Sequence, residues 1–372
     1  MNILGISCFY HDSASALMQD GKVVAAVEEE RFTRKKHSNE FPRQSVQYCL
    51  DHAGIKINDV DYIGFYEIPK NKFDRLINTH LHYFPQTYEQ FKPFAALWFM
   101  RNLQMENVLR NELKYENELV FVDHHLAHAA SAFLPSGFDK SAIFTIDGVG
   151  EWTTTAWGVG EGHKINLSHE IKFPHSLGLL YSAVTYYLGF KVNNGEGKVM
   201  GLASYGKPKF REQFRELIDI KDDGSFRLNM DYFKFHRGLE MIDEKFDSLF
   251  KCWRKPGDEL KSEHEDLAAT LQDVLEEAIL KMANNIHKQT GLKKICIGGG
   301  VGLNSVANGR VLKETPFTDM FIQPASSDAG SSLGSALYIH NCVLGNEDRW
   351  NMDVYSGHSA THEEVKNSSM WS

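Results

Sequence analysis

IFTIDGVG, at residues 143–150, joins an apolar strand to an aspartate and a glycine turn. A second strand is expected at 153–159, followed by a polar turn at 160–162 and a third apolar stretch at 165–167. The first 31 residues show the same order of strands, expected at 3–6, 14–18 and 23–27. This recurrence predicts an internal duplication, and therefore an α/β protein of two related lobes.

Periodicity and turn signals predict further elements around these strands. Helices are expected at 43–53, 177–188, 304–312 and 328–339, and buried strands at 60–65 and 294–297. The aromatic region 73–113 is also expected to be helical. A longer helix is expected to begin at the capping box Ser262-Glu263-His264-Glu265 and to end at Gly291. The polar stretch 221–257 is typical of an irregular insertion.

Length, charge and cysteine content exclude several classes of protein. The chain has 372 residues, 42% hydrophobic and 24% charged, as in ordinary globular proteins rather than disordered or fibrous ones. Its 40 basic and 49 acidic residues give a net charge of −9, so no overall basic field is available to hold nucleic acid. No apolar run approaches the roughly 20 residues of a membrane-spanning helix. Five scattered cysteines without a CxxC pair are typical of reduced thiols, so we expect a cytoplasmic protein without nucleic-acid or membrane partners.

A histidine cluster is the first candidate for chemistry. In a helix, His124 and His128 would share one face and could bind one metal ion, although core or surface histidines are the commoner explanation of such a pair. Asp147 and Asp328 each follow a predicted strand or open a predicted helix, where carboxylates are usually functional or capping. Two histidines with one or two aspartates would suit iron(II), manganese or zinc, and the ligand set does not choose among them.

Three glycine loops are candidates for holding a phosphate-bearing ligand. IGGGVGLN at 297–304 combines a strand, a glycine turn and a helix start, which lets a nucleotide approach the backbone. A tight crossover turn explains this motif equally well, because neither the P-loop nor the GxGxxG spacing is present. DGVG at 147–150 and NNGEGK at 193–198 could face the same cleft. Together the loops favour a phosphate-bearing ligand between the two lobes.

A run of charges lies close to the first strands. EEERFTRKKH at 28–37 is typical of a solvated strand end. Lys36 within it and His11 in the first turn are nevertheless candidates for positioning an anionic donor and for taking a proton from an acceptor.

Several of these stretches together resemble one enzyme family, the NodU/CmcH O-carbamoyltransferases of nodulation and antibiotic synthesis. The resemblance extends over nearly the whole chain and rests on LGIS at 4–7, FYHDSA at 9–14, EERFTRKKH at 29–37, HHLAHAASAF at 124–133, IDGVGEW at 146–152, PHSLGLLYS at 174–182, and GGV at 299–301 with Leu303-Asn304. It implies an actin-like, sugar-kinase-type (ribonuclease H-like) fold of two related lobes. We expect the first lobe at residues 1–140, the second at 141–345 with the nucleotide and metal loops, and a tail or linker at 346–372.

The resemblance also implies a reaction and a set of site residues. In the family, carbamoyl phosphate and ATP give carbamoyl adenylate, whose carbamoyl group passes to a substrate hydroxyl. By motif, the ligands of a divalent metal, expected to be iron(II), are His124, His128, Asp147 and Asp328. His11 would lie at the acceptor hydroxyl and Lys36 would hold the donor. The nucleotide would be held by Gly148, Gly150, Glu196, Gly299, Gly300 and Asn304.

The chain departs from the family pattern in two respects. Family members usually continue into a YrdC-like domain that makes the adenylate, whereas this sequence stops shortly after YSGHS at 355–359, which resembles the lead into that domain. A separate YrdC-like domain or protein is therefore an expected partner. Ser327 and Ser331 stand where the family often has glycine, and Gly302 where alanine is usual. These changes are expected to reshape the nucleotide edge without removing a ligand.

The expected acceptor is a small hydroxylated compound such as a sugar, antibiotic or toxin precursor, chosen by residues 62–99 and 221–257. Three alternatives stay open at this point: a single-chain tRNA threonylcarbamoyl transferase, a non-catalytic nucleotide-binding subunit, and an actin-like ATPase or kinase. The acidic balance and the closer motif match favour the small-molecule carbamoyltransferase over the tRNA enzyme.

Overall fold

The computed structural model describes residues 1–352 and 354–357, the side chain of residue 90 excepted. The first of its two large sheets has the strand order β3-β2-β1-β4-β5. Its strands are β1 (Asn2–Ser7), β2 (Ala14–Gln19), β3 (Lys22–Glu28), β4 (Tyr62–Phe65) and β5 (Glu118–Phe121). β2 is antiparallel to both of its neighbours, and β4 and β5 continue parallel to β1.

The second large sheet has the order β12-β11-β6-β7-β8. Its strands are β6 (Lys140–Ile146), β7 (Thr153–Glu161), β8 (Lys164–Lys172), β11 (Lys294–Gly298) and β12 (Asp319–Ile322). The pairing repeats that of the first sheet, because β7 is antiparallel to β6 and β8 while β11 and β12 run parallel to β6. The predicted duplicated, actin-like two-lobe fold is therefore confirmed.

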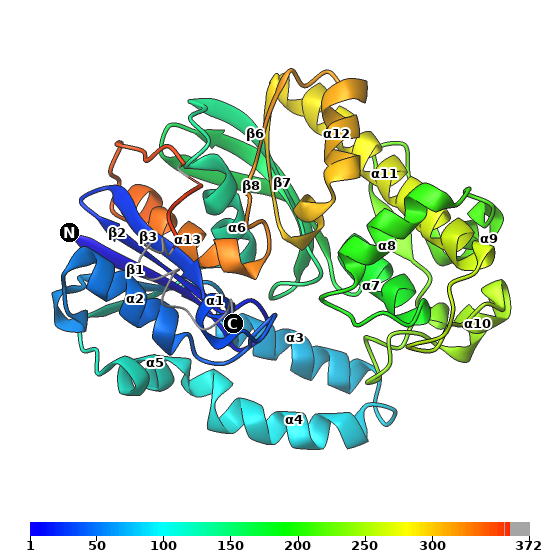
Figure 1. Ribbon diagram of the computed structural model, residues 1–372, viewed down its shortest axis with the longest axis horizontal. Helices are drawn as coiled ribbons and strands as arrows, with labels where there is room; N and C mark the ends of the chain where they lie inside the picture. The colour runs from blue at the N-terminus through cyan, green and yellow to red at the C-terminus, as the bar shows by residue number, and fades with distance from the viewer. Residues whose placement is uncertain (353, 358–372) are drawn as a thin grey trace, which may run out of the picture.

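Two helices lie between the sheets (Figure 1). α6 (His124–Phe133) follows β5, and α13 (Asp328–Tyr338) follows β12, so the two helices occupy equivalent places in the two repeats. α13 packs on β1 and β2 of the first sheet, whereas α6 packs on β6 and β11 of the second and against α13 itself. Each repeat thus places its last helix against the sheet of the other, and the starts of both helices meet between the lobes.

Glycines permit this close packing. A Cβ atom at Gly5 in β1 would lie 1.8 Å from the Ser332 carbonyl oxygen of α13. One at Gly334 in α13 would lie 1.9 Å from the Ala127 carbonyl oxygen of α6. Any side chain at either position would force the helices away from each other and from the sheet.

The remaining helices of the first lobe are α1 (Glu30–Thr33), α2 (Arg43–Ala53), α3 (Pro69–His82), α4 (Tyr88–Met100) and α5 (Met105–Leu113). α2 agrees with the predicted bounds, and the predicted helical region 73–113 contains α3, α4 and α5. Figure 1 shows α3 extending from the first lobe toward the second.

The second lobe has a core around one long helix, α11 (Ser262–Thr290), whose buried side includes Leu267, Leu271 and Leu275. Its start differs from the predicted capping box, because Ser262 is already helical and the Lys261 backbone N–H donates to His264 Nδ1 at 2.9 Å. The other helices of this lobe are α7 (Leu177–Tyr187), α8 (Glu196–Leu202), α9 (Arg211–Leu217), α10 (Glu244–Phe250) and α12 (Ser305–Glu314). No helix of the described residues is both long and apolar enough to cross a membrane.

The predicted insertion is more ordered than its polar composition indicates. It holds β10 (Phe226–Leu228), which pairs with β9 (Ile218–Ile220), and α10. Phe233, Phe246 and Phe250 are buried in the core of the second lobe. Aromatic burial therefore anchors a stretch that otherwise carries solvated charges. After α13 the chain returns to the first sheet, where the Ala26 N–H donates to the Ser356 carbonyl at 2.8 Å. The rest of the predicted tail, residues 353 and 358–372, lies outside the described residues.

Candidate active site

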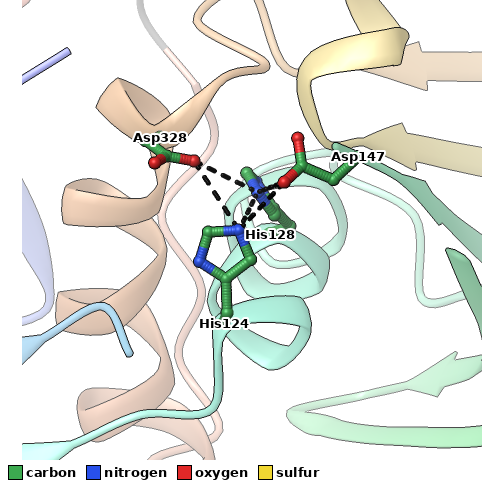
Figure 2. A group of neighbouring side chains, drawn as sticks. All are labelled: His124, His128, Asp147 and Asp328. Atoms are coloured by element: carbon green, nitrogen blue, oxygen red, sulfur yellow. Dashed lines mark hydrogen bonds and ion pairs between the residues drawn. The ribbon is translucent and has the colours of Figure 1, made fainter. Parts of the chain in front are cut away.

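Four side chains named from the sequence converge at the starts of the two central helices (Figure 2). His124 is the first residue of α6, and His128 lies one turn further on the same face. Asp147 follows β6 directly, and Asp328 is the first residue of α13. All four are buried, and each offers one ligand atom within 4.8 Å of the other three.

The distances between these atoms fit a single cation. His124 Nε2 lies 3.0 Å from His128 Nε2, 3.2 Å from Asp147 Oδ2 and 3.6 Å from Asp328 Oδ1. His128 Nε2 lies 4.0 Å from Asp147 Oδ2 and 3.8 Å from Asp328 Oδ1. Donors bound about 2.1 Å from one ion are separated by roughly 3 to 4 Å, depending on the angle between them.

Asp328 also provides unpartnered oxygen atoms that could bind a cation. Both carboxylate oxygens of Asp328 are fully enclosed and have no hydrogen-bond partner among the described residues. Burial raises the pKa of Asp328, although His11 and His124 oppose this effect. Burial also lowers the pKa of His124, but Asp328 and Asp147 outweigh it and raise that pKa to about 10. The unpartnered oxygens of Asp328, together with two imidazoles and the Asp147 carboxylate, form a donor set that fits a divalent ion.

Neighbouring groups orient the ligands. Ser331 Oγ lies 3.0 Å from His128 Nδ1, which leaves Nε2 of that ring free for an ion when Nδ1 carries the proton. The Gly300 backbone N–H donates to Asp147 Oδ1 at 2.8 Å, so the other oxygen of Asp147 faces the histidines. Ser331 was expected only to reshape the nucleotide edge; the structure places it against a ligand.

The start of α6 is fixed in the same way. The Asp123 side chain caps the helix by accepting the Leu126 N–H at 3.0 Å. Glu151 accepts the His124 backbone N–H at 3.2 Å and the Ile68 N–H at 2.7 Å. Burial is the largest cause that raises the pKa of Glu151 to about 7. A Cβ atom at Gly150 would lie 2.8 Å from His124 Cδ2, so this predicted site glycine makes room for the ligand ring.

His11 lies beside the cluster. Its Nε2 is 3.8 Å from Asp328 Oδ2, and its Nδ1 donates to Asp12 Oδ2 at 3.0 Å. The other oxygen of Asp12 lies 2.6 Å from His37 Nδ1. Burial lowers the pKa of His11, but Asp328 and Asp12 outweigh it and raise the pKa to about 9. His11 is thus a proton-exchanging group held in a fixed orientation at the edge of the four ligands.

A cavity of about 330 Å³ opens next to His11. Four predicted nucleotide residues line it: Gly148, Glu196, Gly300 and Asn304. Gly150 and Gly299 are not among the lining residues; Gly299 has a φ of 91°, and a Cβ atom there would lie 2.3 Å from the Ile146 carbonyl oxygen. Lys36 is exposed and does not line the cavity either, whereas its neighbour His37 does.

Two polar side chains of the cavity wall bond other protein groups, and a large part of the wall is apolar. Asn304 caps α12 by accepting the Ala307 N–H at 3.0 Å, and it also pairs with the Gln272 amide. Glu196 accepts the Ser182 hydroxyl at 2.9 Å. The aliphatic side chains that line the cavity are Val149, Leu179, Val192, Met200, Met241, Leu275, Val301 and Leu303. A flat ring of low polarity would fit such a wall.

Gly302 has a different role from its neighbours. A Cβ atom at this position would lie 2.4 Å from the buried Ser326 Oγ. The glycine and the serine are therefore matched in size, which gives a physical reason for glycine where alanine is usual in the resembled family.

Some site residues were not named from the sequence. Asp12 stands in the quoted motif beside His11, and its position in a tight turn was the available signal. Ser331 was named only for the nucleotide edge and Glu151 was not singled out, because the roles of both residues depend on which segments meet in space.

Known proteins resemble this chain over most of its length. A family model described as "Carbamoyltransferase N-terminus" matches residues 2–337. An uncharacterized protein of Synechocystis sp. is 48% identical over 93% of this chain, and nodulation protein NolNO of Sinorhizobium fredii is 37% identical over 90%. The chain spans 58% and 47% of the lengths of these two relatives. Among solved structures, full-length HypF in its phosphate- and nucleotide-bound form aligns with 94% of this chain and 56% of its own, at 14% identity and a TM-score of 0.47.

Proposed function

The chain belongs to the carbamoyltransferase family, and from this premise we propose that it carries the centre that transfers a carbamoyl group from carbamoyl adenylate to a hydroxyl of a small acceptor. The observation that supports the proposal most directly is the cluster of His124, His128, Asp147 and Asp328 with His11 at its edge and a cavity beside it. Asp147, one of these four residues, lines the cavity. A donor bound in the cavity would therefore have its reactive end near the cluster.

The nucleotide part of the donor would occupy the cavity. Its base would lie against the apolar wall, and its phosphate would face the glycine loops at 147–150 and 299–304. Lys36 would approach the donor from the first lobe. The donor itself would come from carbamoyl phosphate and ATP through a YrdC-like domain or protein.

A divalent ion held by the four ligands, expected to be iron(II), would polarise the carbamoyl carbonyl. The chain's own groups account for the proton. Asp12 accepts the Nδ1 proton of His11, and His11 Nε2 faces the four-ligand cluster. Asp328 is the main group that raises the pKa of His11, so a cation bound by Asp328 would favour the neutral imidazole, whose Nε2 can accept the proton of the acceptor hydroxyl. The hydroxyl oxygen forms its bond to the carbamoyl carbon as the bond from that carbon to the AMP oxygen breaks, and AMP leaves as the anion.

Metal content and single-turnover transfer test this proposal together. Protein purified without oxygen should contain about one ion per chain and should transfer the carbamoyl group from synthetic carbamoyl adenylate to members of a panel of hydroxylated acceptors. His128→Ala should lose both properties, whereas His52→Ala, an exposed histidine on α2, should lose neither.

Two results would count against the proposal. Wild-type protein without metal would contradict the ligand assignment. Stoichiometric metal with nucleotide binding but no transfer would favour a non-catalytic subunit.

A further inference from the structure

One buried arginine near the site has no hydrogen-bond or ion-pair partner among the described residues. Arg75 lies on α3 and is 6% exposed, and no ion pair or hydrogen bond engages its guanidinium within the described part of the chain. Its Nε atom is fully enclosed, whereas the two terminal nitrogens are not. The ring of Phe173 lies 5.0 Å from the guanidinium carbon and covers one face. The donating end of Arg75 is therefore available to a ligand that approaches from solvent.

Two other shielded arginines of this protein have hydrogen-bond acceptors. Arg254, which is 9% exposed, donates to the Leu188 carbonyl at 2.7 Å and to the Asp258 carbonyl at 2.9 Å. Arg349 donates to three backbone carbonyls. A guanidinium withdrawn from water without such partners is unfavourable. Burial accordingly lowers the pKa of Arg75 to about 10.

The acids near Arg75 are committed to other groups. Glu67 pairs with Lys72 at 2.5 Å. Glu151 accepts the backbone N–H groups of Ile68 and His124. Neither carboxylate lies within ion-pair distance of Arg75, so the five N–H donors of this side chain are matched by nothing in the described protein.

Arg75 lies at the first-lobe side of the site. Lys72 is one helical turn before it on the same face of α3, and Lys72 Nζ lies 4.9 Å from the centre of the Tyr10 ring. Tyr10 contacts His11, with 4.6 Å between their ring centres, and it lines the cavity. Arg75 itself does not line the cavity. The glycine loops at 147–150 and 299–304 belong to the second lobe, whereas Arg75 belongs to α3 of the first.

We propose that Arg75 binds an anionic group of the acceptor, a carboxylate or a phosphate ester. This inference rests on the proposed carbamoyl transfer and narrows its acceptor to hydroxylated compounds that carry a negative charge. A planar guanidinium can hold either group by two parallel hydrogen bonds. The position outside the nucleotide cavity favours the acceptor over the donor phosphate as the source of the anion.

The first test uses inorganic phosphate as the probe and the Arg75 Nε–H signal in NMR as the readout, with the signal assigned from its loss in Arg75→Lys. In wild-type protein the signal should shift saturably as phosphate is added, and the shift should persist when AMP fills the cavity. Phosphate affinity measured by calorimetry should fall at least about tenfold in Arg75→Met, which keeps an apolar stem against Phe173. Arg43→Met, an exposed arginine of the same lobe, should leave it unchanged.

Each outcome decides the matter. No shift of the Arg75 signal in phosphate overturns the proposal, and so does an equal phosphate affinity in wild type and Arg75→Met. If AMP alone shifts the signal and then excludes phosphate, the anion belongs to the donor and the acceptor assignment is wrong. These measurements need no carbamoyl transfer, so failure of the proposed reaction would be seen separately, as absence of metal or of transfer.

Discussion

At the scale of single residues, the hydroxyl of Ser331 is placed to fix the ring orientation and proton position of the candidate metal ligand His128. Its Oγ contacts His128 Nδ1 at 3.0 Å, and no other described side chain is hydrogen-bonded to that nitrogen. Ser332, the next residue of α13, is equally buried but bonds the Ala329 carbonyl instead. The two serines therefore form a natural matched pair.

We expect Ser331→Ala to weaken metal binding by about 10- to 100-fold, because the imidazole of His128 loses the partner that fixes its orientation and proton position. Ser332→Ala should leave metal affinity unchanged. Competition with a chromophoric chelator measures both. Equal metal affinities in the two variants would contradict the role of Ser331 in orienting His128.

Gly302 makes a second prediction at this scale. Gly302→Ala should lower the free energy of unfolding by about 1 to 3 kcal/mol, because its Cβ atom would meet Ser326 Oγ at 2.4 Å. Urea unfolding measures the loss. Adding Ser326→Gly should restore most of it, whereas Gly309→Ala, which meets no atom within 4 Å, should not destabilise. A Gly302→Ala variant as stable as wild type would show that the serine gives way.

The sequence singled out the four candidate ligands and His11 because each stands in a compact motif, and the structure brings them together. It predicted neither Ser331 as a support nor Arg75 as an unpaired cation. Whether a residue has a partner depends on which distant parts of the chain the fold brings together, and no local sequence pattern records that.

At the scale of elements, the lobes are joined by a contact between the end of α3 and the segment that follows β10. The His236 ring lies 4.5 Å from the Tyr83 ring, and His236 is 4% exposed. Burial is the largest cause that lowers the pKa of His236 to about 4, with Arg237 and His82 adding to it. The folded protein therefore keeps this histidine neutral where an unfolded chain would protonate it.

The sign of the resulting pH dependence follows from linkage. Above about pH 6.5 neither state binds the proton, and between about pH 6.5 and 4 only the unfolded state does, so stability falls as the pH is lowered through that window. At pH 5 this loss should amount to about 1 to 2 kcal/mol. His236→Phe should remove that part of the loss, as measured by urea unfolding at pH 7.5 and 5. A wild type and variant with the same pH slope would contradict the assignment.

Prediction of the elements succeeded where hydrophobic period and turn residues agree. β1, β2 and β3 have apolar cores and an Asp20-Gly21 turn, and α2 ends at Gly54 in the left-handed conformation. The stretch 221–257 was less predictable, because its buried phenylalanines are few among many charges. The start of α11 was misplaced by one residue, since the His264 ring nitrogen, in place of the Glu265 carboxylate of the predicted box, accepts the backbone N–H of the N-cap residue Lys261.

At the scale of the whole molecule, the four candidate metal ligands belong to elements that pack on different sheets. His124 and His128 belong to the helix that covers the second sheet, and Asp328 belongs to the helix that covers the first. An ion that needs all of these ligands would bind the folded protein and not the unfolded chain, and would therefore stabilise the folded state. Loading to about 100 times the dissociation constant should therefore raise the free energy of unfolding by about 3 kcal/mol.

Thermal unfolding with and without a chelator tests this. Chelation should lower the Tm of the wild type and leave that of His128→Ala unchanged. A chelator effect of equal size in both proteins would show that the ion acts elsewhere.

The duplication was visible in the sequence because both repeats begin with the same strand order. The exchange of the last helices between the sheets was not, since it depends on the close approach that Gly5 and Gly334 allow. Those glycines look unremarkable until their neighbours from the other end of the chain are known.

The equivalence of α6 and α13 has a consequence for how such a centre could arise. His124 and Asp328 are the first residues of the two corresponding helices. The two repeats therefore carry an imidazole and a carboxylate at equivalent positions. Two identical half-chains related by a symmetry axis can offer an ion only matching pairs of donors. A single chain that contains both repeats can carry different residues at corresponding positions, as His124 and Asp328 show, so its donors need not be related by symmetry.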